Sequence, residues 1–286
     1  MDSAVRFSDF KGMLHTQSHR KTVISEGDSW FGYPASMVPV SHTGTNIIDH
    51  IEQTHLFNIF RMECSGDEAG AMMSQDQRHR FHDVLSQLKA ISKEPDIILF
   101  SAGGNDIVGE HDMIHLLNRW TAGMSPADCI RTERFELRLE QIRLAYRELI
   151  LFRDEYCPNA KIITHGYDFP IPTDKPACFI FGTVKVKPWI KPYMDQKGIP
   201  AGAIQQEVVK IMITRLNEML DAVCASTSNM VKVETTGTLQ SGEWRDEIHA
   251  TKQGFKKIAD MFLPHMDEAG AAPCLIADSI DSHAGA

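Results

Sequence analysis

The chain has 286 residues, 43% of them hydrophobic, and its charged side chains give a formal net charge of −9. This length suits one decorated domain with a sizeable core, and the composition excludes a collagen, a coiled coil and a disordered chain. Because the charge balance provides no overall basic field to hold a polyanion, we expect no nucleic-acid partner.

The cysteines and the N-terminal region bear on the cellular compartment in which the protein is expected. The six cysteines lie far apart, with neither C-x-x-C nor metal-knuckle spacing, which predicts mostly buried free thiols. Residues 1–21 lack the apolar stretch of a secretory signal, and no apolar run approaches the roughly 18 residues of a membrane span. We therefore expect a reduced, cytoplasmic protein without an integral membrane segment.

Short apolar runs alternate with longer stretches of helical spacing, which is typical of α/β proteins. The runs are short enough to be strands buried on both faces, and the longer stretches have the periodicity of amphipathic helices. In chain order we predict strand 22–25, helix 46–53, strand 57–63, helix 75–92, strand 96–100, helix 133–155, strand 161–165, helix 204–225, strand 230–234 and helix 251–262.

These elements predict one domain over residues 21–266, after an N-terminal extension over 1–20 and before a C-terminal tail over 267–286. Residues 169–202 interrupt the alternation of strands and helices with a proline-rich stretch of about thirty residues, and loops of that length are commonly functional. This insertion is a candidate lid or substrate wall.

A serine follows the first predicted strand, in Gly27-Asp28-Ser29. The carboxyl end of a strand is where open α/β sheets bind their ligands, so Ser29 is a candidate nucleophile. The alternative is a serine that caps a helix or forms a turn, as isolated serines commonly do.

A serine nucleophile needs a base that takes its proton and a third group that orients the base. Asp246 and His249 offer both, three residues apart on a loop before the last predicted helix. Their side chains can face one cleft from such a turn. The alternative is a charge arrangement at the N-terminus of that helix.

The oxyanion of an acyl transfer needs hydrogen-bond donors. Gly66 follows the second predicted strand and Asn105 follows the third, so the Gly66 N–H, the Asn105 amide and the Ser29 N–H are candidates. Each motif alone is a common turn, but their order after successive strands predicts a single site.

These blocks together resemble the SGNH/GDSL hydrolase family. They are Gly27-Asp28-Ser29-Trp30, with Trp in place of the usual Leu, Ser65-Gly66-Asp67, Gly104-Asn105-Asp106 and Asp246-x-x-His249, and the likeness spans residues 23–262. The resemblance implies a flavodoxin-like three-layer α/β/α sandwich with a central, mainly parallel five-stranded sheet. It also implies ester hydrolysis through an acyl-serine intermediate, with Ser29 as nucleophile, His249 as base and Asp246 as its partner. The implied oxyanion hole is formed by Ser29, Gly66 and Asn105.

The sequence departs from the family at two points, of which only the second is expected to alter the acyl pocket and with it the specificity. Ala250 replaces the proline that commonly follows the histidine, and an aromatic segment follows the first block. Candidate substrate contacts are Asp28, Trp30, Phe31 and Trp189, although a core role is equally expected for the aromatic residues. The substrate class is a small-molecule, glycan or lipid ester.

Two other function classes stay open. One is a carbohydrate- or lipid-binding module that keeps the fold without catalysis, although the joint presence of Ser29, Asn105, Asp246 and His249 argues against it. The other is a metal-dependent phosphoesterase, which needs several converging ligands. His79 and His82 lie one helical turn apart, but the neighbouring charges favour a solvated face. We therefore expect neither a metal nor another cofactor.

Overall fold

The computed structural model describes residues 2–33, 45–109, 112–179 and 184–267. The predicted C-terminal tail therefore lies outside the described residues, apart from its first position. The described cysteines with placed side chains are free thiols, of which Cys129 and Cys157 are buried and Cys64 and Cys224 are half-buried. The side chains of the other two cysteines are not among those described.

Six described strands form a central parallel sheet in the order β1-β3-β2-β4-β5-β8. Their near-continuous apolar sequences suit strands that are buried on both faces. The strands are β1 (Ser3–Ala4), β2 (Lys21–Gly27), β3 (Phe57–Arg61), β4 (Ile97–Ser101), β5 (Lys161–His165) and β8 (Met230–Val233). The five predicted strands are confirmed to within a few residues at their ends.

The sheet has six strands instead of the expected five, because the start of the chain joins it. Ser3 and Ala4 pair in parallel with Ile59 and Phe60 of β3. Helix α1 (Phe7–Thr16) then packs on the same edge, with the Phe10 ring 5.2 Å from that of Phe60. Much of the expected N-terminal extension is therefore part of the folded domain.

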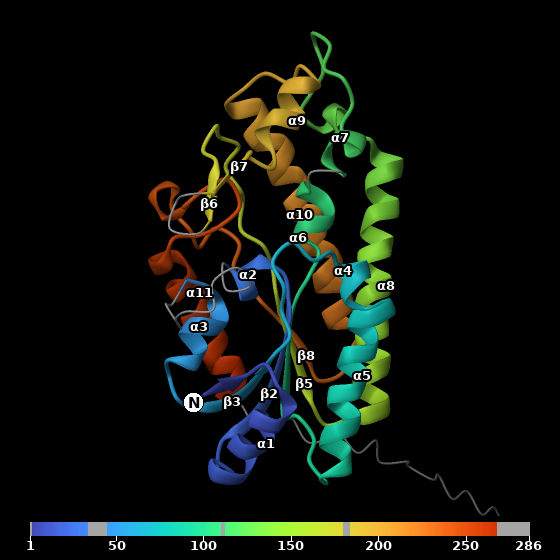
Figure 1. Ribbon diagram of the computed structural model, residues 1–286. Helices are drawn as coiled ribbons and strands as arrows, with labels where there is room; N and C mark the ends of the chain where they lie inside the picture. The colour runs from blue at the N-terminus through green and yellow to red at the C-terminus, as the bar shows by residue number, and fades with distance from the viewer. Residues whose placement is uncertain (1, 34–44, 110–111, 180–183, 268–286) are drawn as a thin grey trace, which may run out of the picture.

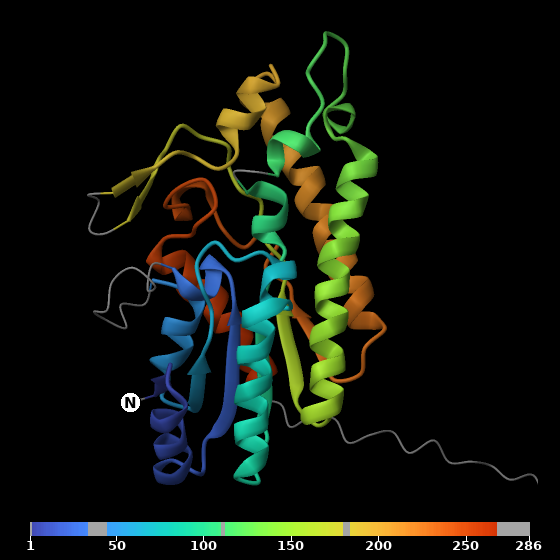
Figure 2. The ribbon, with the colours of Figure 1, turned by 45° about the vertical axis from the view of Figure 1, so that its right-hand side comes forward.

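Helices cover both faces of the sheet and complete a three-layer α/β/α sandwich (Figures 1 and 2). Helices α3 (Ile47–Glu52) and α11 (Lys252–Asp267) cover one face, and α5 (Gln75–Ala90), α8 (Thr132–Tyr156) and α10 (Ala203–Ala225) cover the other. Short helical segments lie between these elements: α2 (Ser29–Gly32), α4 (Ala69–Met72), α6 (Gly104–Val108), α7 (Met113–Leu116), η2 (Ala127–Cys129), α9 (Lys191–Gln196) and η3 (Ser241–Glu243).

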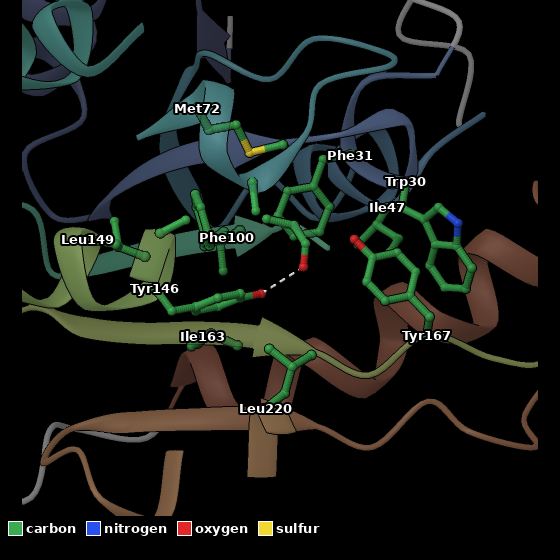
Figure 3. Packing of buried hydrophobic residues seen from close by; sticks show 14 of the residues in the cluster. Trp30, Phe31, Ile47, Met72, Phe100, Tyr146, Leu149, Ile163, Tyr167 and Leu220 are labelled. Carbon is green, nitrogen blue, oxygen red and sulfur yellow. Dashed lines mark hydrogen bonds between the residues drawn. The ribbon is translucent and has the colours of Figure 1, made fainter. Parts of the chain in front are cut away.

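The core between the sheet and α8 is built from buried aromatic and aliphatic side chains (Figure 3). Tyr146 of α8 meets Phe100 of β4 edge to face, with ring centroids 5.1 Å apart. Its buried hydroxyl donates to the backbone carbonyl of Ala102 at 3.0 Å, so the polar atom is satisfied. This contact ties the α8 layer to the segment just beyond the carboxyl end of β4.

The order of the strands explains where a site can form. From β2 the chain goes to β3 on one side and then returns to β4 on the other side of β2. In such sheets, ligands bind outside the carboxyl ends of the two strands at which the direction of winding changes. Ser29 follows β2 and Asn105 follows β4, so the topology brings them to one edge. Gly27, the last residue of β2, allows β2 and β4 to lie close together at this edge, since a Cβ there would lie 2.8 Å from that of Ser101.

The insertion over residues 169–202 has its own secondary structure. It contains an antiparallel pair, β6 (Ala177–Phe179) and β7 (Val184–Val186), followed by α9. Figure 2 shows this pair projecting from the sandwich near the carboxyl ends of the parallel strands. Its role as a lid remains a prediction. Across the described ranges, no helix is long and apolar enough to cross a membrane.

Candidate active site

Ser29, His249 and Asp246 form a continuous hydrogen-bonded chain. The Nε2 atom of His249 lies 2.8 Å from Oγ of Ser29, and its Nδ1 atom lies 3.0 Å from each carboxylate oxygen of Asp246. All three residues are at most 5% exposed. The structure thus brings Ser29 together with a pair of side chains that lie more than two hundred positions further along the chain.

The loop that carries the histidine is closed on itself. Oδ1 of Asp246 also accepts hydrogen bonds from the backbone N–H groups of Ile248 and His249, at 3.0 and 2.9 Å. The Arg245 N–H donates to the His249 carbonyl at 2.9 Å, and the Trp30 indole donates to the Ile248 carbonyl at 3.0 Å. The imidazole is therefore held in one orientation by its own loop and by the nucleophile segment.

The Asp246 carboxyl stays ionised in this setting. Burial by itself raises its pKa, but the charge of His249 and the hydrogen bonds from the His249 ring and the loop N–H groups outweigh burial. The resulting pKa lies below the usual range for an aspartic acid. An ionised Asp246 can both orient the imidazole and stabilise its protonated form.

Two aromatic side chains enclose the His249 ring. Tyr33 stacks on it with ring centroids 4.1 Å apart, and Trp189 meets it edge to face at 5.2 Å. The Arg245 guanidinium in turn lies 5.1 Å from the centroid of Tyr33. The sequence pointed to Trp189 as a substrate contact; in the structure it touches the histidine. Tyr33, in the aromatic segment for which substrate contact and a core role were both expected, likewise touches the histidine.

The segments with the candidate oxyanion donors are linked to the nucleophile segment. Gly66 is exposed and has a φ of +93°, which favours glycine. Just before it, the Cys64 N–H donates to the Gly27 carbonyl at 2.9 Å. The Asn105 amide donates to the Asp67 carbonyl at 2.9 Å. Because an amide has two N–H groups, Asn105 can bind Asp67 and still offer a donor to a ligand.

Asp28, next to the candidate nucleophile Ser29 in the chain, lies in a buried polar network. One of its oxygens accepts from the Trp30 N–H at 2.9 Å and from the Ser101 hydroxyl at 2.8 Å, and the other accepts from the Tyr167 hydroxyl at 2.5 Å. Burial raises the pKa of Asp28 to about 6, against the opposing effect of these hydrogen bonds. The network continues from Ser101 to Nε2 of His165 at 2.7 Å.

His165 is neutral in this network, since burial lowers its pKa to about 4. Neither His165 nor Tyr167 was identified as a site residue from the sequence. The His165 ring stacks on the indole of Trp30 with centroids 5.2 Å apart and planes inclined by 14°. Trp30, the residue after Ser29, is thereby held by the His165 ring as well as by the histidine loop.

The two aromatic residues after Ser29 differ in their placement. Trp30 lines a small cavity that Ser29 and Asn105 also line. Phe31 is fully buried, packs against Phe262 with centroids 5.9 Å apart and does not line that cavity. The expectation that Phe31 contacts substrate is therefore replaced by a core role, because its side chain points to α11 instead of the cleft.

Glu247, between the two loop residues of the candidate triad, was not identified from the sequence. Its side chain is fully buried. Oε1 accepts from the backbone N–H groups of Thr173 and Lys191 at 3.0 and 2.9 Å, and Oε2 accepts from that of Ile190 at 2.8 Å. The Ile171 N–H donates to the Glu247 carbonyl at 3.2 Å. One residue thus binds two separate parts of the insertion.

Within the described ranges, no group of three or more His, Cys, Asp or Glu side chains is arranged to hold a metal ion. His79 and His82 line a surface groove on α5 and α8 together with Arg78 and Glu148. His79 is exposed and His82 is half-buried.

Comparison with known proteins adds information on the fold. No family model matches the sequence, and no curated protein is similar to it in sequence. The lipase Lip_vut3 from a goat rumen metagenome has a similar structure, with a TM-score of 0.50 and 12% identity over 85% of this chain and 96% of that one. The chain has the fold of the SGNH hydrolases.

Two further solved structures are similar over most of their length. An extracellular lipase from Streptomyces rimosus has a TM-score of 0.48 and 17% identity over 87% of this chain and 99% of its own. The acetyl xylan esterase AlAXEase has a TM-score of 0.46 and 14% identity over 85% and 98%. At these identities the comparisons bear on the fold alone.

Proposed function

We propose that this protein is a serine hydrolase that cleaves carboxylic esters through an acyl-serine intermediate. The observation that carries the proposal is the contact of the Ser29 hydroxyl with His249, whose other nitrogen contacts Asp246. A hydroxyl, an imidazole and a carboxylate in this order are what nucleophilic catalysis requires. The similarity in fold to solved lipases and esterases supports the same reaction class.

In the first half of the reaction, Ser29 Oγ attacks the carbonyl carbon of the ester while Nε2 of His249 takes the hydroxyl proton. The carbonyl π electrons move to the oxygen, which becomes an oxyanion. The backbone N–H groups of Ser29 and Gly66 and the Asn105 amide are the proposed donors to this oxyanion. Asp246 holds the opposite side of the imidazole and stabilises its positive charge.

The intermediate then collapses to the acyl-serine. The oxyanion electrons re-form the carbonyl, the bond to the alcohol oxygen breaks, and His249 gives its proton to that oxygen. A water molecule attacks the acyl-serine by the same route, with His249 again acting first as base and then as acid. The carboxylic acid leaves, and Ser29 recovers its proton.

A fluorophosphonate and an aryl acetate test this proposal together. We expect one phosphonyl group per chain at Ser29, found by mass spectrometry of its peptide, and hydrolysis that Ser29→Ala lowers by about 10⁶-fold. Ser125→Ala, a serine-to-alanine change on a surface turn, serves as the matched control. A folded protein that neither accepts the label nor cleaves aryl esters would contradict the proposal and favour a binding module.

The same assay separates the metal-dependent alternative. A serine mechanism needs no metal, so we expect EDTA to leave the rate of aryl acetate hydrolysis unchanged. Loss of activity with EDTA, together with restoration by a divalent cation, would favour a metal-dependent phosphoesterase.

A further inference from the structure

A small cavity lies beside the proposed nucleophile. Ser29 and Asn105 line it from the reacting side. Its remaining wall includes Val108 of α6, Pro170 of the insertion and Ile213 of α10. The cavity is therefore next to the position at which the acyl carbon would bond to Ser29, and its wall is largely apolar.

The volume of this cavity is about 20 Å³. One water-sized group requires on the order of 10 to 15 Å³ on this measure, so the space accepts one such group and little more. The wall cannot simply move aside, because Ile213 and Val108 are 1% and 5% exposed and belong to the packed core. In close-packed interiors, each additional methylene must displace neighbouring side chains.

We propose that this cavity is the acyl pocket and restricts the enzyme to acetyl esters and esters of similarly short acids. Ile213 and Val108 are its specificity-determining residues. This inference rests on the proposed function, because it assumes that the acyl group is transferred to Ser29. It adds the substrate class, which the triad alone does not determine: the acyl chain is short, whereas the alcohol part lies outside this cavity.

Aryl acetate, butyrate and octanoate test the acyl pocket through their kcat/KM values. For the parent protein we expect acetate to exceed butyrate by at least about 10-fold, because one poorly accommodated methylene changes kcat/KM by about 10- to 200-fold. Ile213→Ala opens the wall, so the acetate-to-butyrate ratio should fall about 10-fold. Leu220→Ala, at a fully buried position on the same helix that does not line the cavity, should keep the parent ratio.

The outcomes distinguish this inference from the proposed function. Equal kcat/KM values for acetate and octanoate, with normal labelling of Ser29, would overturn the short-acyl pocket and leave the serine hydrolase intact. An unchanged ratio in folded Ile213→Ala would also overturn it. If that variant does not fold, Ile213→Val makes the same test with a smaller expected change. Absence of both labelling and turnover would instead contradict the proposed function.

The hydrogen bonds of Glu247 carry a second inference, independent of the cavity. We infer that Glu247 is a positioning residue that fixes the insertion against the histidine loop. Its carboxylate binds backbone N–H groups at Thr173, close to Pro170, and at Ile190 and Lys191, next to Trp189. These are the parts of the insertion that line the cavity and touch the His249 ring.

An amide at this position cannot replace the carboxylate. Glutamine has one acceptor oxygen, and its NH₂ group is a donor that would face backbone donors. In Glu247→Gln the insertion should therefore loosen, and Trp189 should lose its fixed contact with His249. Glu247→Asp keeps both acceptor oxygens on a shorter side chain, so we expect it to restore part of the loss.

Rate constants calculated per folded, labelled molecule separate an effect on the position of the insertion from an effect on the stability of the fold. We expect Glu247→Gln to lower the rate constant for phosphonylation of Ser29, and kcat per labelled site, by about 10- to 100-fold, since a displacement of about 1 Å can have such an effect. Glu218→Gln, the same change on the exposed side of α10, is the control. Trp189→Ala should have little additional effect in the Glu247→Gln background.

A lower Tm with unchanged rate constants per labelled site would overturn the role of Glu247, because it would show a purely structural contribution. If Glu247→Gln does not fold, the same two rate constants can be measured for Glu247→Asp and for Trp189→Ala. Parent rates in both of these variants would likewise contradict the inference.

Discussion

The two sides of the candidate active site differ in how firmly they are held. On the base side, Asp246 and His249 are buried, and their loop is closed by hydrogen bonds to its own backbone and to Trp30. On the side of the proposed oxyanion donors, called the oxyanion side below, Gly66 is exposed and Asn105 is half-buried. The base side is therefore firmly organised, whereas Gly66 and Asn105, two of the three proposed oxyanion donors, lie on a more open surface.

This difference has a chemical reason. Proton transfer from Ser29 to His249 needs a short, well-directed contact at the moment the hydroxyl attacks. The oxyanion donors are needed only while charge accumulates on the carbonyl oxygen. Substitutions on the two sides should therefore differ both in their effect on the rate and in their effect on stability, and the following changes test this from the largest expected effect to the smallest.

The largest effect is expected on the base side, for His249→Ala. Without the imidazole, no group takes the Ser29 proton, so kcat for aryl acetate should fall by about 10⁶-fold. Steady-state kinetics with active-site titration measures the loss. A loss below 100-fold would show that another base serves Ser29. The contrast between the base side and the oxyanion side would then have no basis.

Asp246→Asn should lower kcat by about 10⁴-fold, because the amide can favour the wrong tautomer of His249. The acceptor role toward the Ile248 and His249 N–H groups can be kept by the asparagine oxygen. We therefore expect a fold that survives with poor catalysis, which circular dichroism and kinetics would measure together. Near-parent activity would show that the orientation of His249 does not depend on this carboxylate.

Asn105→Ala should lower kcat by about 10² to 10³-fold, as the loss of one oxyanion donor typically does. Because the side chain is only half-buried and loses one hydrogen bond to Asp67, Tm should change little. Kinetics and thermal melts check both parts. A larger loss in kcat than in Asp246→Asn would contradict the expectation that substitutions on the base side have the larger effect.

Tyr167→Phe tests the buried polar network of Asp28. It removes the hydroxyl that donates to buried Asp28, and a buried group left without its partner costs about 1 to 3 kcal/mol of stability. Denaturant unfolding measures this cost. We expect kcat to change by less than about 10-fold, because the hydroxyl contacts Asp28 instead of a reacting atom. Unchanged stability would show that the network contributes nothing to holding the nucleophile segment.

The last expected effect is a pH dependence of stability. The Asp28 pKa is raised from 3.8 to about 6 in the fold, so between these values the native state binds more protons than the unfolded state. This group's contribution to the free energy of unfolding therefore decreases as pH rises through that window, by up to about 1.4 kcal/mol per pH unit.

The difference in unfolding free energy between the parent and Asp28→Asn, followed from pH 4 to 7, isolates this contribution from those of other groups. The parent should lose stability relative to the variant as pH rises. A difference that is constant over the window would contradict the raised pKa.

Much of the fold could be predicted from local patterns. The apolar spacing of Phe135, Leu139 and Ile142 predicted a helix over 133–155, and α8 spans Thr132–Tyr156. In contrast, β1 was not predicted because it has only two residues and exists through pairing with β3. The helical segments α2, α4, α6 and α7 were also missed, since four or five residues show no clear periodicity, whereas α3 was predicted over 46–53.

The residues of the candidate site also divide into those that the sequence could identify and those that it could not. Ser29 and Asn105 could be selected because their residue types and their places after strands fit acyl-transfer chemistry. Asp246 and His249 could be selected because they lie three residues apart on a loop before the last predicted helix. Glu247 could not be selected, because its partners are main-chain N–H groups 56 to 74 positions away. No residue type signals an acceptor for backbone atoms at that distance.

The insertion between β5 and α10 contributes no strand to the six-stranded sheet, yet it supplies Pro170 to the cavity and Trp189 to the histidine. In the proposed esterase, substrate preference can therefore diverge by replacement of this one segment while the architecture underneath stays the same. Grafting a different insertion between Asp168 and Ala203, with the glutamate anchor retained, would be a direct route to variants of altered selectivity.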